Sequence, residues 1–246
     1  MNIIAIIPAR YASTRFPGKP LVLINGKSMI RNVYERVSMI VDDVIVATDD
    51  YRIENEVKSF NANYVMTSKK HKSGTDRCAE ALIIYEKQIN KKFDAVINIQ
   101  GDEPFIKAEH ITKVLNIIKK EQTQIASLVK RIGENVDIFN PDKPKVIIDN
   151  NNNAIYFSRS PIPYIRDTEK DKWNKKHTFY KHIGIYAYKS NILSEITKLK
   201  QSSLERAESL EQNRWIENNY TISIDYTELE SLSIDTNEDL KKALSF

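Results

Sequence analysis

The chain has 246 residues, of which 41% are hydrophobic and 28% charged, and 37 Lys and Arg against 33 Asp and Glu leave a formal net charge of +4. Six Gly and eight Pro are too few for a collagen-like, low-complexity or mainly disordered chain, so one large folded domain, alone or with a small insertion, is expected. The charge is too small to indicate a nucleic-acid-binding protein. The single cysteine, Cys78, excludes an intramolecular disulfide and a thiolate zinc site.

No apolar run approaches the roughly 20 residues of a membrane-spanning helix. The run Ile3–Ile7 has no basic segment before it and ends at Pro8, so we interpret it as a buried strand rather than a signal peptide. We therefore expect a cytoplasmic protein with neither membrane nor nucleic acid as a partner.

Short apolar runs alternate with helical patterns through the first half of the chain. The predicted strands are Ile3–Ile7, Val44–Ala47, Tyr64–Met66, Ala95–Ile99 and Ile125–Val129. Between them, apolar stripes with helical spacing occur in four places, at 29–37, 53–60, 78–83 and 111–118. This alternation is typical of βαβ units and predicts an α/β fold with a mostly parallel, Rossmann-type sheet covered by helices.

The pattern changes after Arg131. Val146–Ile148 and Ala154–Phe157 flank an Asp- and Asn-rich run, as in a hairpin, and a charged stretch at 166–176 is interpreted as an exposed loop. A strand at 183–188, a helix at 212–217, a strand at 220–224 and a last helix follow, the last beginning at Thr236 with Asp239 in capping-box spacing. We predict a nucleotide-binding core of residues 1–130 and 205–246, with residues 131–204 as an inserted subdomain.

The segment that follows the first strand, PARYASTRFPGKPL, contains three cations in one loop: Arg10, Arg15 and Lys19. Ligands of doubly wound sheets bind at the carboxyl ends of strands, and cations beside backbone amides suit a polyphosphate. Ser13, Thr14 and Gly18 add hydrogen-bond donors. The spacing matches neither the P-loop nor the G-x-G-x-x-G loop of dinucleotide folds. A solvated basic loop is the structural alternative.

Acidic residues follow another predicted strand and precede the last helix. Asp102 and Glu103 in NIQGDEPF are placed where a carboxylate can reach a divalent cation held by phosphates, and Asp235 directly precedes the capping Thr236. Either segment, taken alone, could simply start a helix. In HKSGTDR, small residues together with Arg77 suit the approach of a flat base, or alternatively an ordinary loop that caps the next helix.

Eight segments of the chain resemble, in order and spacing, those of the 3-deoxy-manno-octulosonate (Kdo) cytidylyltransferase family, and together they cover essentially the whole chain. The segments are PARYASTRFPGKPL, ATDD, SGTDR, NIQGDEPF, FSRSPIP, KHIGIYAY, LEQNRWIENNY and SIDTNEDL. The resemblance implies a nucleotide-diphospho-sugar transferase-like fold. It also implies the Mg²⁺-dependent reaction of CTP with Kdo to give CMP-Kdo and pyrophosphate, for lipopolysaccharide biosynthesis in the cytoplasm. A homodimer is implied too, with residues 131–204 as the expected subunit contact or, alternatively, a lid over the sugar.

The resemblance also implies roles for particular residues. The catalytic residues would be Lys19, Arg10, Asp102 and Asp235, and the two aspartates would hold the metal. The nucleotide would be bound by Ala9, Arg10, Arg15, Lys19, Ser73, Gly74, Arg77 and Gln100. The sugar acid would be met by Gln100, Arg159, His182, Tyr186 and Glu211, in which the planar fork of Arg159 suits the carboxylate.

Three questions stay open at this level. The acid could be Kdo, its 8-amino analogue or a nonulosonic acid. The reaction could use one metal ion or two. The alternative from another functional class is a regulatory protein that binds the nucleotide but has no catalytic activity. Two positions depart from the family pattern, Asn219 and Ser233, where glycine is common. Asn tolerates the left-handed backbone conformation that such a glycine adopts, whereas Ser233 raises a question about the backbone path into Asp235.

Overall fold

A computed structural model describes residues 1–12, 16–230 and 232–244. The described residues form one nine-stranded mixed sheet in which seven strands follow the order β11-β7-β10-β6-β1-β4-β5. Pairing is parallel for β1 with β4 and β6, for β4 with β5 and for β7 with β11, whereas β10 runs antiparallel between β6 and β7. The strands are β1 (Ile3–Ala9), β4 (Asp43–Thr48), β5 (Tyr64–Met66), β6 (Ala95–Asn98), β7 (Ile125–Arg131), β10 (Tyr180–Lys189) and β11 (Ile222–Thr227).

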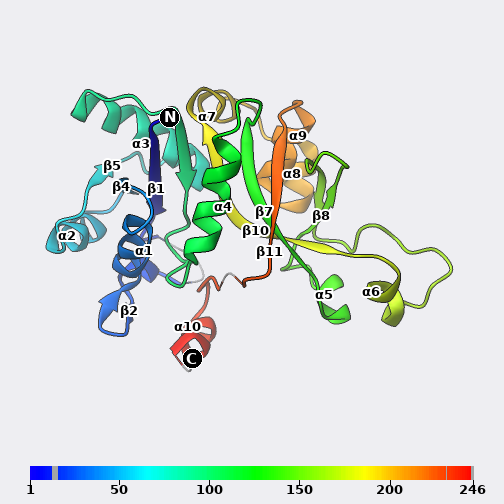
Figure 1. Cartoon of the computed structure of the whole chain (residues 1–246). Coiled ribbons are helices and arrows are strands. Elements are labelled where there is room, and N and C mark those ends of the chain that lie inside the picture. Colours follow the sequence, from blue (N-terminus) through cyan, green and yellow to red (C-terminus); the bar gives the residue numbers. More distant parts are fainter. Residues whose placement is uncertain (13–15, 231, 245–246) are drawn as a thin grey trace.

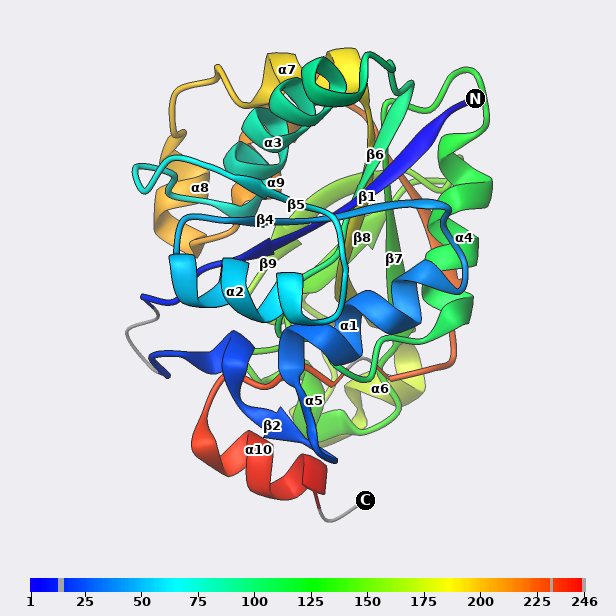
Figure 2. The ribbon, with the colours of Figure 1, turned by 90° about the vertical axis from the view of Figure 1, so that its left-hand side faces the viewer.

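Helices cover both faces of this sheet, and each face has its own apolar cluster (Figures 1 and 2). One face packs against α1 (Met29–Ser38), α2 (Tyr51–Ser59) and α4 (Ala108–Ile118). The other packs against α3 (Gly74–Ile89), α7 (Ser190–Ile196) and α9 (Glu211–Glu217), with α8 (Ser203–Glu208) before α9. The strands are runs of buried β-branched residues, as expected for a sheet covered on both faces.

Short polar side chains fix where the helices begin. Ser28, Asp50 and Ser73 precede α1, α2 and α3, and each accepts a hydrogen bond from a backbone N–H of the first turn. Such caps satisfy amide groups that have no partner inside the helix. Because Asp50 and Ser73 lie just beyond β4 and β5, these caps also set the position of the loops at the carboxyl edge of the sheet.

The section from 131 to 179 has two parts. The hairpin of β8 (Lys145–Ile148) and β9 (Ala154–Ser158) joins the main sheet and packs against α9. The short helices α5 (Asn135–Ile138) and α6 (Trp173–Lys176) form a separate small cluster around Trp173, which projects from one side of the sheet in Figure 1. Residues 180–189 of the predicted inserted subdomain are β10, inside the central sheet.

The end of the chain returns to the first loop. Helix α10 (Asn237–Leu244) lies beside the hairpin of β2 (Leu23–Ile24) and β3 (Lys27–Ser28), in both views of the ribbon. A small cluster that contains Phe16, Ile24 and buried Ile234 joins the two. The Ile234 N–H donates to the Asp102 carbonyl over 2.9 Å, so the segment before α10 is attached to the loop after β6.

The predicted strands are confirmed, with ends shifted by a few residues, and so are the mostly parallel sheet, the hairpin tip and the Thr236–Asp239 capping box. Two predictions were wrong. The buried stripe of α3 does not include Ile83, which is 64% exposed, because Ala81, Leu82 and Tyr85 face the core instead. The stretch 166–176 is not wholly an exposed loop, since Trp173 is buried among aromatic rings.

The structure shows the backbone at Asn219 and near Ser233, the two positions where this chain departs from the glycine common in the family. Asn219 has a φ of +64°, so it takes the left-handed conformation expected of it. After Ser233 the chain is directed by the buried side chain of Ile234 and its hydrogen bond to Asp102. None of the helices in the described ranges combines the length and the apolar composition needed to cross a bilayer.

Candidate active site

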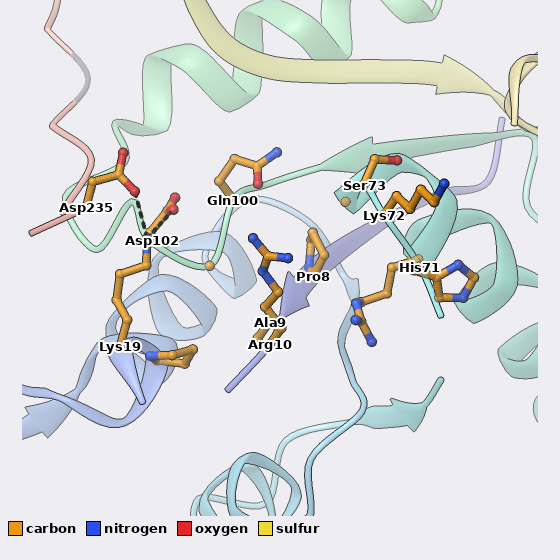
Figure 3. Close-up of a pocket in the computed structure, with 14 residues that line it drawn as sticks. Pro8, Ala9, Arg10, Lys19, His71, Lys72, Ser73, Gln100, Asp102 and Asp235 are labelled. Atoms are coloured by element: carbon orange, nitrogen blue, oxygen red, sulfur yellow. Dashed lines mark hydrogen bonds and ion pairs between the residues drawn. The ribbon is translucent and has the colours of Figure 1, made fainter. Parts of the chain in front are cut away.

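A pocket of about 280 Å³ opens at the carboxyl edge of the sheet, between the ends of β1 and β6 and the first turn of α3. In Figure 3, Lys19, Asp102 and Asp235 form one side, Pro8, Arg10 and Gln100 the middle, and His71, Lys72 and Ser73 the other side. Fourteen residues line it: Pro8, Ala9, Arg10, Lys19, Pro20, His71, Lys72, Ser73, Gly74, Arg77, Gln100, Gly101, Asp102 and Asp235.

Lys19 joins the two aspartates. Its Nζ lies 2.7 Å from Oδ2 of Asp102 and 3.0 Å from Oδ1 of Asp235, and its side chain is 11% exposed. Lys19 begins a short 3₁₀ turn after Gly18, whereas the aspartates come from the loop after β6 and from the segment before α10. Two carboxylates therefore face one cationic point, and partial burial strengthens this attraction relative to an exposed pair.

The first turn of α3 forms the opposite side of the pocket. Its N-cap is Ser73, whose Oγ accepts from the Asp76 N–H over 3.1 Å. A Cβ on Gly74 would lie 3.3 Å from Cγ of Pro8 and 3.7 Å from Oε1 of Gln100, so glycine allows the helix to approach β1 closely. The N-terminus of a sixteen-residue helix attracts anions because its N–H groups are unpaired and its dipole is positive there.

Arg77 lies at the base of the pocket and is 4% exposed. Its Nη2 donates to Asp49 over 2.8 Å and its Nη1 donates to the Thr67 hydroxyl over 2.6 Å. These two partners follow β4 and β5, so Arg77 ties the loops of two neighbouring strands to α3. The paired guanidinium stays fixed in orientation, as a buried arginine requires.

The structure brings together the residues proposed for the nucleotide and the metal. The pocket contains Ala9, Arg10, Lys19, Ser73, Gly74, Arg77, Gln100, Asp102 and Asp235. Arg15, with Ser13 and Thr14, lies outside the described residues. His71 and Lys72 also line the pocket; they belong to the basic run 69–72, for which the sequence leaves open a phosphate-steering patch or a solvated loop. Their position in the sequence, directly before the helix N-cap Ser73, is the feature that indicates a place in the pocket.

The residues proposed for the sugar acid, other than Gln100, do not line this pocket, but two of them lie next to one another on β10. The rings of His182 and Tyr186 have centroids 5.1 Å apart, and Tyr186 is opposite Asn98, two residues before Gln100. Burial lowers the pKa of His182 to about 3 and raises that of Tyr186 well above its usual value. Both side chains are therefore neutral at pH 7, as hydrogen-bonding rather than charged groups.

Glu211, at the start of α9, lies behind the α3 turn. Its Oε2 accepts from the Thr75 hydroxyl over 2.7 Å and its Oε1 accepts from Arg214 over 2.8 Å. Burial raises the pKa of this carboxyl. Glu211 also lines a second hollow, which shares Lys72 and Ser73 with the first.

Arg159 follows β9, and its side chain donates to two carbonyls. Nε donates to the Glu208 carbonyl over 2.7 Å and Nη1 donates to that of Pro141 over 3.0 Å. The buried Lys145 donates from below to the Arg159 carbonyl over 2.6 Å. The Arg159 carbonyl is thus held by Lys145, while the Arg159 guanidinium bridges the loop before β8, at Pro141, and the end of α8, at Glu208.

Comparison with known proteins identifies the family to which this chain belongs. A model of the family described as cytidylyltransferase matches residues 4–224. The 3-deoxy-manno-octulosonate cytidylyltransferase of Parabacteroides distasonis is 56% identical, over 100% of this chain and 98% of its own. A solved structure of CMP:2-keto-3-deoxy-manno-octonic acid synthetase complexed with CTP superposes with a TM-score of 0.89, at 37% identity, over 100% of this chain and 98% of that one.

A cytidylyltransferase structure from Leptospira borgpetersenii shares the fold alone, with a TM-score of 0.63 at 15% identity over 100% of this chain and 86% of that one. The fold and the pocket define a nucleotidyltransferase of the nucleotide-diphospho-sugar transferase type, which confirms the predicted fold class. The chain belongs to the cytidylyltransferase family and, within it, to the 3-deoxy-manno-octulosonate cytidylyltransferases, as the sequence motifs predicted.

Proposed function

We propose that this protein joins CTP to Kdo and releases pyrophosphate, in the cytoplasm of bacteria that build lipopolysaccharide. The observation that carries the proposal is the pocket itself, where Arg10 and Lys19 face the N-terminus of α3 across the ends of β1 and β6. Cations and unpaired amides on opposite walls suit a triphosphate. The solved relative whose structure contains CTP matches the whole chain.

The nucleoside end of CTP would lie at the α3 side of the pocket. Ser73 and Gly74 present backbone groups there, and Arg77 is held rigidly by Asp49 and Thr67. The small residues Ser73 and Gly74 on this wall would leave room for the approach of a flat base. Lys72 and His71, on the same wall, add donors within reach of the ribose or the phosphates.

Mg²⁺ would be held by Asp102 and Asp235. Carboxylate oxygens are the donors that Mg²⁺ prefers, and the two already face a common cationic partner, the Lys19 ammonium. The described residues contain no cluster of three or more His, Cys, Asp or Glu side chains fit for a metal, which suits an ion whose other ligands are phosphate oxygens and water. When bound, the ion would neutralise phosphate charge and lower the pKa of a coordinated hydroxyl.

The sugar acid would lie beyond Gln100, along β10 and α9. Gln100 borders the nucleotide pocket, and Tyr186 lies on the neighbouring strand near the end of β6. His182, Tyr186 and Glu211 supply hydrogen-bonding groups for hydroxyls, and Arg159 supplies a planar fork for the carboxylate. In this proposal the acid would lie beside the α-phosphate of CTP.

The reaction we propose is an in-line displacement at the α-phosphorus. The anomeric hydroxyl of Kdo gives up its proton to water as its oxygen forms the new bond to the α-phosphorus, while the bond from that phosphorus to the α–β bridging oxygen breaks and pyrophosphate leaves. Lys19 and Arg10 would neutralise charge on the transferring and leaving groups, and the sugar residues would orient the attacking hydroxyl. The protein thus contributes mainly positioning and electrostatic stabilisation.

The direct test is pyrophosphate release from CTP and Mg²⁺ with Kdo, with its 8-amino analogue and with neuraminic acid. Rapid release with Kdo and slow release with the other two acids is the expected result. A preference for either of the other two acids would support the proposed reaction with CTP but would show that Kdo is not the preferred acid. CTP binding without release with any acid would indicate a regulatory module instead.

We also propose a homodimer that uses the projecting section 131–179. Exposed apolar side chains occur there at Val136, Ile155 and Tyr164, which are 73%, 52% and 73% exposed. Val136 and Tyr164 lie in the projecting part and Ile155 in the β8–β9 hairpin, and exposed apolar side chains of this kind could contribute to a subunit contact. Light scattering should give twice the chain mass, and a monomer that retains full activity would favour the alternative role of this section as a lid.

A further inference from the structure

The side chain of Tyr11 is close to both an arginine and a glycine that are far apart in sequence. The guanidinium carbon of Arg52 is 3.2 Å from the Tyr11 ring centroid, so the two planar groups are in direct contact. A Cβ added to Gly18 would lie 3.2 Å from three atoms of the same side chain, including the hydroxyl oxygen. Tyr11 also packs against the apolar cluster on the α1–α2 face of the sheet.

Arg52 is itself fixed in place. Its Nε and Nη2 donate to Oδ1 and Oδ2 of Asp50 over 2.9 and 2.7 Å, a two-bond fork. Asp50 is the N-cap of α2 and accepts the Arg52 backbone N–H as well. The guanidinium that touches Tyr11 is therefore oriented by the beginning of a helix, unlike a freely rotating surface side chain.

The Tyr11–Gly18 contact forms a neck between the two cations of the pocket, Arg10 and Lys19. The Gly18 N–H donates to the Tyr11 carbonyl over 3.0 Å, and Gly18 has a φ of +72°, which suits glycine. Arg10 precedes this neck and Lys19 follows it directly, and both side chains line the pocket. A shift at the neck therefore moves both cations relative to Asp102 and Asp235.

We infer that Arg52 is a positioning residue, which acts through Tyr11 to hold Arg10 and Lys19 in place for the triphosphate of CTP. The inference rests on the proposed function, because the ligand is the nucleotide proposed above. Arg52 does not line the pocket and touches no proposed substrate group. Its effect should therefore appear in CTP affinity and not in sugar-acid binding, and kcat should change little, because a small shift of Arg10 and Lys19 weakens their contacts with the triphosphate to a similar extent before and during the reaction.

The chain supplies a matched control nearby. Arg31 pairs with Glu35 and lies over the ring of Phe60 at 5.5 Å, so it resembles Arg52 in having a carboxylate partner and an aromatic contact. Neither Arg31 nor Phe60 lines the pocket. The variants are Arg52→Ala, Tyr11→Ala, their combination, Tyr11→Phe, which keeps the ring, and Arg31→Ala as the control.

Two measurements are made on each variant, CTP binding by calorimetry without the acid and steady-state pyrophosphate release. We expect Arg52→Ala and Tyr11→Ala each to weaken CTP binding and raise its KM about three- to fivefold, in line with a partly exposed cation–π contact. The kcat and the KM for the acid should stay within about twofold of wild type. The double variant should be no worse than either single one, because both remove the same contact. Tyr11→Phe and Arg31→Ala should bind CTP like the wild type.

Equal CTP affinity in Arg52→Ala and Arg31→Ala would overturn the inference, and so would additive losses in the double variant. A general loss of kcat and thermal stability in Arg52→Ala would also overturn it, because that result indicates a structural role only. A wild-type chain that binds CTP but releases no pyrophosphate would refute the proposed function. The calorimetric comparison would still decide the role of Arg52.

Discussion

The Thr75 hydroxyl donates a 2.7 Å hydrogen bond to the Glu211 carboxylate, although the two residues are 136 positions apart. Thr75 lies in the first turn of α3, next to Ser73 and Gly74 of the nucleotide pocket, and Glu211 begins α9. Arg214 holds the other carboxylate oxygen. A residue proposed to bind the sugar acid, Glu211, is thus hydrogen-bonded directly to the helix turn proposed to bind the nucleotide. The position of Glu211 at the sugar site therefore depends on the position of the first turn of α3 at the nucleotide site.

Thr75→Val should test this link. The change keeps the shape of the side chain but leaves a buried carboxylate oxygen without its donor, which should cost about 1–3 kcal/mol of unfolding free energy. The KM for Kdo should rise because Glu211 loses one of the contacts that orient its carboxylate. Urea unfolding and steady-state kinetics measure the two effects. Thr227→Val is the control: Thr227 donates to Glu109, an exposed carboxylate that water can satisfy, so it should cost clearly less. Equal losses would contradict the argument.

Gly101→Ala should damage the pocket through the backbone. The added Cβ would lie 2.9 Å from the Pro8 carbonyl oxygen, closer than real Cβ contacts, so β1 or the loop after β6 has to move. We expect an unfolding free energy lower by about 1–3 kcal/mol and weaker CTP binding. Gly133→Ala is the matched control, since nothing lies within 4 Å of its added Cβ. The explanation fails if the two alanine variants are equally stable and bind CTP equally well.

Asp235→Asn should separate charge from shape at the proposed metal site. The amide keeps the size of the side chain but removes a negative ligand, so kcat should fall by orders of magnitude and more Mg²⁺ should be needed for half-maximal rate. Calorimetric titration of Mg²⁺ in the presence of CTP gives a readout that does not depend on turnover. Glu238→Gln, an exposed carboxylate in the first turn of α10, is the control. Normal turnover at the wild-type Mg²⁺ requirement would remove Asp235 from the site.

The nucleotide pocket could be predicted from the sequence because its parts follow parallel strands. The loop after β1, the loop after β6 and the first turn of α3 meet wherever such strands are neighbours, which depends only on local pattern and on the βαβ rule. The place of Asp235 is less local. It depends on the burial of Ile234 and on the hydrogen bond of Ile234 to the Asp102 carbonyl, which no periodicity reveals.

The position of the antiparallel strand β10 in the sheet could not be predicted from the hydrophobic pattern of the sequence. Its apolar run predicts a strand, but nothing in that run indicates insertion between β6 and β7, since pairing partners are set by packing over long sequence distances. The same reason applies to His71 and Lys72, whose position depends on the path of the loop before Ser73. The predicted division into residues 1–130 with 205–246 and 131–204 stays a prediction.

His182 should make stability depend on pH. Its Nε2 lies 2.9 Å from the Ser127 hydroxyl, its ring packs edge-on against Phe157, and burial lowers its pKa to about 3. In the unfolded chain the pKa returns to about 6.5, so the unfolded state binds more protons between these values. Stability from this group is therefore present above about pH 6.5 and is lost as the pH falls, by at most about 1.4 kcal/mol per pH unit.

Urea unfolding of the wild type and His182→Gln between pH 7.5 and 5.0 measures this loss. The variant has no imidazole to protonate on unfolding, so its unfolding free energy should fall less over this range, by up to about 2 kcal/mol at pH 5. Part of the slope should remain, because burial also lowers the pKa of His110. His177→Gln, at an exposed position, should keep the wild-type slope. If His182→Gln shows the same slope as the wild type, then His182 is protonated as readily in the folded chain as in the unfolded one, and the lowered pKa of this side chain at the proposed sugar site is refuted.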